Sequence, residues 1–98
     1  MKSFTYEWPN EFDGIYLLHV QIDLAKGCTQ NVTIIRTFKD KTKKEQNSVF
    51  LGNSNRFIVS RSHINEEKVE ILYPPAAKLK VYEIDDRAYY PTESLFDE

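Results

Sequence analysis

The chain has 98 residues, 41% of them hydrophobic and 29% charged, which is enough for one domain with a single core. Thirteen lysines and arginines against fifteen aspartates and glutamates give a net charge of −2. Proteins that hold a nucleic-acid backbone usually carry an excess of cations, so we do not expect nucleic acid as a partner. The one cysteine, Cys28, excludes an internal disulfide and a cysteine-rich zinc site.

The first residues of the sequence bear on where the protein is found. Residues 1–9 hold no apolar run before the charges begin, so we expect no secretory signal there. Elsewhere, no segment has the length needed to cross a bilayer. Together with the lone cysteine, this predicts a cytoplasmic protein that does not contact a membrane.

The dominant pattern is an alternation of apolar and polar residues, whose period of two belongs to half-buried strands. A first strand is expected at 3–8, and the clearest alternation follows at 15–23. Residues 31–38 are rich in β-branched side chains, which suit a pleated sheet. Further strands are expected at 48–51, 56–60, 68–73 and 78–84.

The residues between these segments support the same fold. Glycine, proline and asparagine lie where turns are needed, and residues 62–67 are the one segment that could hold a helical turn. The pattern predicts an all-β protein, a single antiparallel β-sandwich (jelly-roll or Ig-like) of about six to seven short strands in residues 1–84. Residues 85–98 are expected to form an irregular aromatic and acidic segment. We expect its large apolar residues to dock, at a subunit or partner interface in preference to the domain itself.

Two predicted strands carry a family resemblance. Residues 13–20, with their Gly-x-Tyr-x-Leu-x-Val pattern, and the closing strand at 78–84 resemble jelly-roll sandwiches of the carbohydrate-binding-module kind. The resemblance implies a sandwich fold. It carries no function here, because no ligand residue of that family maps onto this sequence.

Residues that could perform chemistry are sparse. His19 and His63, near a lysine, could transfer protons in a nuclease-like reaction, but neither lies in a catalytic motif. Cys28 lacks the flanking signature of a nucleophile. The glycines form no phosphate-binding loop and the acidic residues have no metal-ligand spacing. We therefore predict a protein that is not an enzyme, with no cofactor and no metal, and keep nuclease-like activity as a third hypothesis.

Two features suggest binding instead. Four lysines gather in a predicted hairpin connection, where they can contact phosphates or an acidic protein surface, or simply discourage edge-to-edge aggregation. The tyrosines and the tryptophan exceed what a small core needs, and exposed aromatics anchor interfaces or stack on sugar rings. The alternative is that Tyr16, Tyr73 and Tyr82 pack the sandwich with their hydroxyls at its rim. We therefore predict a protein-interaction module (an accessory subunit, inhibitor or adaptor) that binds a protein partner or itself, with a carbohydrate-binding sandwich as the alternative. The predicted binding residues are Trp8, Tyr73, Tyr89, Tyr90, Phe96, Lys41, Lys43 and Lys44.

Overall fold

A computed structural model describes residues 1–9, 17–24, 29–84 and 91–97 of the chain. These residues contain eight strands and no helix. The strands are β1 (Lys2–Glu7), β2 (Leu17–Asp23), β3 (Thr29–Phe38), β4 (Lys43–Leu51), β5 (Ser54–Ser60), β6 (Glu66–Tyr73), β7 (Lys78–Ile84) and β8 (Pro91–Asp97).

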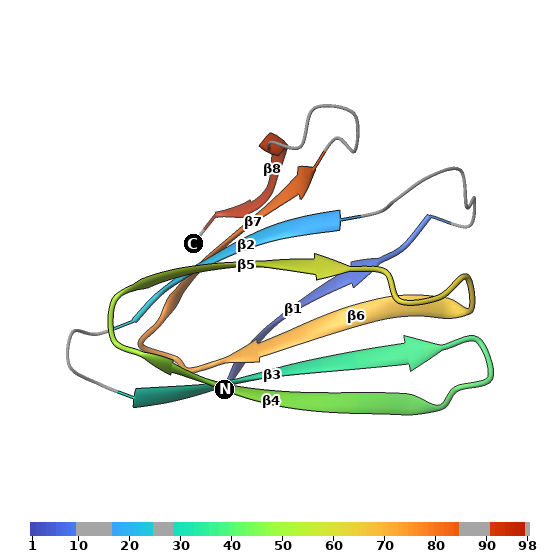
Figure 1. Cartoon of the computed structure of the whole chain (residues 1–98), viewed down its shortest axis with the longest axis horizontal. Coiled ribbons are helices and arrows are strands. Elements are labelled where there is room, and N and C mark those ends of the chain that lie inside the picture. The colour runs from blue at the N-terminus through green and yellow to red at the C-terminus, as the bar shows by residue number, and fades with distance from the viewer. Residues whose placement is uncertain (10–16, 25–28, 85–90, 98) are drawn as a thin grey trace.

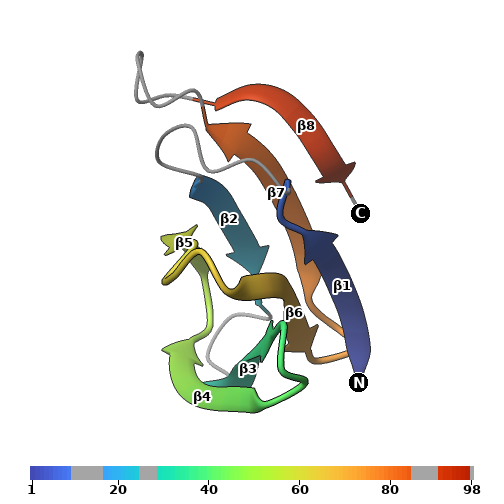
Figure 2. The same cartoon turned by 90° about the vertical axis from the view of Figure 1, so that its right-hand side faces the viewer.

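The strands form two antiparallel sheets, which confirms the predicted all-β sandwich (Figure 1). The first sheet has the order β1-β6-β3-β4 and the second has the order β5-β2-β7-β8. Figure 2 shows the two layers from the side, with β4 near β5 at one end and β1 near β7 and β8 at the other. Edge strands of the two sheets therefore face each other at both ends of the sandwich.

Alternation of side chains builds the core between the sheets. Leu18, Val20 and Ile22 of β2 are fully buried, and Val20 lies opposite Phe57 of β5 and Val81 of β7. Their intervening neighbours on β2 are half-buried, as a period of two requires. The strongest alternation in the sequence thus lies in a central strand of the second sheet.

An aromatic pair joins the two sheets at each end. Phe4 of β1 and Phe96 of β8 have ring centroids 5.2 Å apart, and Phe50 of β4 stacks on Phe57 of β5 at 5.4 Å. All four rings are partly buried against the core. Aromatic pairs at such separations stabilise a fold beyond the area that they bury.

The structure differs from the sequence-based expectation in three elements. Strand β4 begins at Lys43 instead of residue 48, and residues 61–65 form a loop instead of a helical turn. Part of the C-terminal segment is not irregular, because β8 pairs with β7. Leu95 and Phe96 dock as expected, but they pack on the core of this domain.

Candidate functional site

A buried charge organises one end of the sandwich. Glu66, at the start of β6, has no exposed area. Its carboxylate accepts hydrogen bonds from Trp8 Nε1 at 2.5 Å, from Arg36 Nη1 at 3.0 Å to either oxygen, and from the backbone N–H and hydroxyl of Ser62. Both oxygens are thus fully used by partners, so the group supports the fold and is not available to transfer protons to a substrate.

Two arginines fix the loop that precedes Glu66. Arg36 donates to the carbonyl oxygen of Ser60 at 2.8 Å, beside its ion pair with Glu66. Arg61 donates to the carbonyl oxygens of Pro9 at 2.9 Å and Ile64 at 2.9 Å. Loop 61–65 is therefore held at both ends by charged hydrogen bonds, which are stronger than neutral ones.

The hairpin between β3 and β4 lies beside this loop. Asp40 accepts hydrogen bonds from the backbone N–H of Thr42 at 3.0 Å and its hydroxyl at 2.6 Å. These bonds lower the pKa of Asp40 below its ordinary value, because they stabilise the ionised form. Lys41 has a φ of 71°, and a residue with such left-handed backbone commonly comes directly after the tight turn of a hairpin. The hydrogen bonds of Asp40 thus fix the conformation of the hairpin turn.

The lysines predicted to bind a partner point in different directions. Lys41 pairs with Glu67 at 3.2 Å, which joins the hairpin to β6. Lys43 and Lys44 are consecutive on β4 and lie on opposite faces of the strand. Lys44 is on the face toward the second sheet, opposite Arg36, with its ammonium 5.8 Å from the centre of the Phe38 ring.

A cavity of about 380 Å³ lies between the hairpin and loop 61–65. The loop contributes His63 and Asn65 to its wall, and the hairpin contributes Phe38, Lys39 and Lys44 among others. A smaller cavity of about 280 Å³ continues past Lys44 along the inner face of β4. Lys44 lines both cavities.

Strand β4 is exposed over most of its length. It is an edge strand of nine residues that pairs with β3 alone among the described strands. Val49 and Leu51 leave 63% and 73% of their surface exposed. The strand therefore has a basic beginning, at the cavities, and an apolar end.

The predicted aromatic site is not assembled. Trp8 and Tyr73 are 5% and 1% exposed, so the expectation that they offer a binding surface was wrong. Trp8 is buried because its indole N–H has a partner in Glu66, and Tyr73 because its ring fills the core. Phe96 is half-buried against Phe4. The predicted residues Tyr89 and Tyr90 lie outside the described residues.

The two histidines occupy different elements. His19 is in the middle of β2, with its ring 6.2 Å from that of Tyr82. His63 is in loop 61–65, and its Nδ1 accepts a hydrogen bond from the N–H of Asn65 at 3.1 Å. Cys28 lies outside the described residues. No group of metal-ligating side chains is found among the residues that the structure describes.

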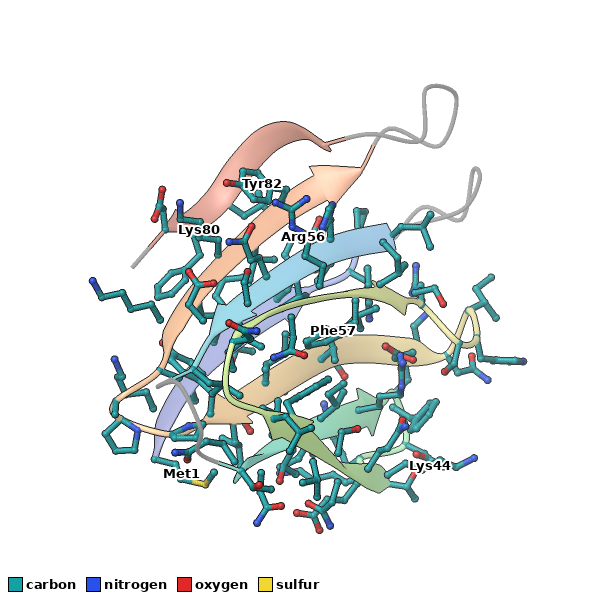
Figure 3. The ribbon with its side chains drawn as sticks, turned by 60° about the vertical axis from the view of Figure 1, so that its left-hand side comes forward. Met1, Lys44, Arg56, Phe57, Lys80 and Tyr82 are labelled. Carbon is teal, nitrogen blue, oxygen red and sulfur yellow. The ribbon has the colours of Figure 1, made fainter. Side chains whose placement is uncertain are left out.

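The outer face of the second sheet gathers a second set of polar groups. His19 lies between Ile58 of β5 and Tyr82 of β7, and the next row contains Arg56, Gln21 and Lys80. Figure 3 shows Arg56, Lys80 and Tyr82 on this sheet, away from Lys44 near the start of β4. This face and the cavities are thus separate candidate sites.

Comparison of the chain with protein-family models, curated proteins and solved structures found no match in any of the three. Within the described residues, no helix is long and apolar enough to span a membrane.

Proposed function

We propose that this protein is a non-enzymatic interaction module that binds an extended segment of a partner protein along the outer edge of β4. The observation that carries the proposal is the exposure of Val49 and Leu51 on an edge strand of nine residues. Such a strand spans about 30 Å at about 3.3 Å per residue, which is enough to pair with a segment of similar length.

An edge strand offers hydrogen bonds as well as side chains. Backbone N–H and C=O groups along the outer side of β4 have no strand partner among the described residues. A segment that adds to this edge gains backbone hydrogen bonds for affinity, while alternate side chains provide specificity. The two ends of β4 differ in chemistry, so they would select a segment that is acidic at one end and apolar at the other.

Protection against aggregation is the competing explanation for the lysines on this edge. It accounts for Lys43 and Lys44, which lie at the beginning of the strand. It does not account for the apolar end, because more than half of the surface of Val49 and of Leu51 is exposed and no lysine lies between them. The support for binding comes from that unprotected end.

A proline scan of β4 tests the proposal. Consecutive backbone N–H groups of a strand point to opposite sides, so one of Asn47→Pro and Ser48→Pro removes a bond to β3 and the other blocks only the outer edge. Peptides selected from a random library are expected to bind the wild type and to lose binding to the variant that keeps the native melting temperature. Equal binding to that variant and the wild type would refute strand addition.

The outer face of the second sheet supports a second candidate function, the binding of a glycan. The observation in its favour is the row of Tyr82 and His19 beside Arg56, which combines aromatic rings with hydrogen-bond donors. A glycan array with the wild type and Tyr82→Ala tests it. Binding that the variant loses would support this function, and an empty array would end it.

A further inference from the structure

We propose that the cavity between the β3–β4 hairpin and loop 61–65 binds a carboxylate side chain of the partner segment that pairs with β4. The inference rests on the proposed function and adds to it the chemistry of the partner, an extended acidic peptide. The cavity lies where β4 begins, so a segment on the outer edge would carry a side chain to it.

The charges around the cavity favour an anion. Lys39 and Lys44 line it and make no ion pair among the described residues, whereas Lys41 nearby is paired with Glu67. The one carboxylate in the lining, that of Asp40, is engaged by both donors of Thr42. Two lysines thus line the cavity, and the carboxylate of Asp40 is already engaged by the turn.

His63 adds a hydrogen-bond donor to this wall. Its Nδ1 accepts the N–H of Asn65, so in the uncharged ring the proton lies on Nε2. Nε2–H is a hydrogen-bond donor, and the ring lines the same cavity as the lysines. A carboxylate oxygen is the acceptor that such a set of donors requires.

The cavity is held in shape before any ligand binds. The backbone N–H of Lys39 donates to the carbonyl oxygen of Asn65 at 2.8 Å, which ties the hairpin to the loop. Within the loop, the N–H of Glu66 donates to the carbonyl oxygen of His63 at 2.9 Å. The buried Glu66 carboxylate anchors the same loop through Ser62. A wall fixed in this way loses little entropy on binding.

The cavity has a size that suits one or a few side chains of a peptide. At about 380 Å³ it is near the lower end of ligand pockets, which run from about 300 to 1,000 Å³. The Phe38 ring under the Lys44 ammonium gives the wall an apolar surface for the methylene groups of a glutamate. The observations therefore commit the site to an acidic side chain of a peptide.

The test uses ¹⁵N-labelled protein titrated with an acetylated, amidated hexaglutamate peptide and, at the same ionic strength, with its hexaglutamine counterpart. Lys39→Gln and Lys44→Gln are compared with Lys78→Gln, an exposed lysine on β7 that gives the same change in net charge. We expect chemical-shift changes at residues 38–44 and 61–66. We also expect each cavity variant to weaken hexaglutamate binding by about threefold or more, with no change for Lys78→Gln.

Other outcomes would overturn the inference. Equal weakening by all three variants would mean a general charge effect, and equal binding of hexaglutamine would mean that the carboxylate is not recognised. The proline variant of β4 separates this inference from the proposed function. If hexaglutamate still binds the proline variant but not the lysine variants, carboxylate binding in the cavity is supported and strand addition is refuted. If it still binds the lysine variants but not the proline variant, strand addition is supported and carboxylate binding in the cavity is refuted.

Discussion

Replacing Glu66 by glutamine is the sharpest test of how the candidate site is built. The change keeps the size of the side chain and removes its charge. Arg36 then loses its ion-pair partner, and the new amide N–H₂ group faces donors such as the Trp8 indole N–H. At least one donor must therefore go unsatisfied in a fully buried position.

The expected cost follows from burial. Removing one partner of a buried ion pair costs about 3–5 kcal/mol. Because 20% of the Arg36 side chain is exposed, water offsets part of that loss, and we expect Glu66→Gln to lower the free energy of unfolding by about 2–4 kcal/mol. A domain of this size has about 5–15 kcal/mol in total, so the variant stays folded at room temperature but melts about 10–30 °C lower.

Urea unfolding followed by tryptophan fluorescence measures this change, because the single tryptophan, Trp8, touches the substituted group. Glu67→Gln is the matched control. It removes the same charge one residue later, from an ion pair with Lys41 whose side chains are 42% and 76% exposed. We expect that control to cost less than about 0.5 kcal/mol. Equal losses for the two variants would refute the argument that Glu66 is a buried structural charge.

Three further predictions concern other parts of the fold. Lys41→Gly is expected to raise the free energy of unfolding by about 0.5–1 kcal/mol, because the backbone φ of 71° at this position is costly for a residue with a Cβ atom. Urea titrations measure this change, and a loss of stability would contradict it. Phe96→Ala is expected to lower it by about 2 kcal/mol, since a half-buried ring on Phe4 is lost, and an unchanged melting temperature would show that β8 is not part of the core. Burial raises the pKa of Tyr73, so the unfolded chain loses the phenol proton at lower pH than the folded protein, and stability is expected to fall as the pH rises above about 10. Melting temperatures measured across this pH range should fall less steeply for Tyr73→Phe than for the wild type. An equally steep fall in both would mean that other groups cause the pH dependence.

The central strands were predictable because each of them buries one face. Residues 18–23 and 78–81 alternate apolar and polar side chains in sequence, and they lie in the neighbouring strands β2 and β7. The start of β4 was missed for the opposite reason. Residues 43–47 are exposed on both faces of an edge strand, so they show no alternation that a sequence pattern can reveal.

The C-terminal strand was missed because its pairing is irregular. Register shifts interrupt the β7–β8 ladder after Val81 and again after Glu83, so the apolar residues of β8 do not follow a simple period of two. Its aromatic content did predict that Phe96 docks. Sequence composition could not show that the surface receiving it belongs to the same domain.

The candidate site was predictable in part. The hairpin lysines stand out as a local cluster, and Lys44 does line the cavities. His63 and Asn65 complete the wall from a loop about twenty residues further along the chain, and no motif links them to the hairpin. The contact of Trp8 with Glu66 spans 58 residues of sequence, and it arises from the pairing of β1 with β6, which no local sequence pattern reveals.

The most direct test of strand addition at β4 is hydrogen exchange of the backbone amides in the complex with a library-selected peptide. We predict that alternate amides of β4, those that point away from β3, exchange quickly in the free protein and become protected when the peptide binds. Protection that appears on the outer face of the second sheet, with β4 unchanged, would contradict it.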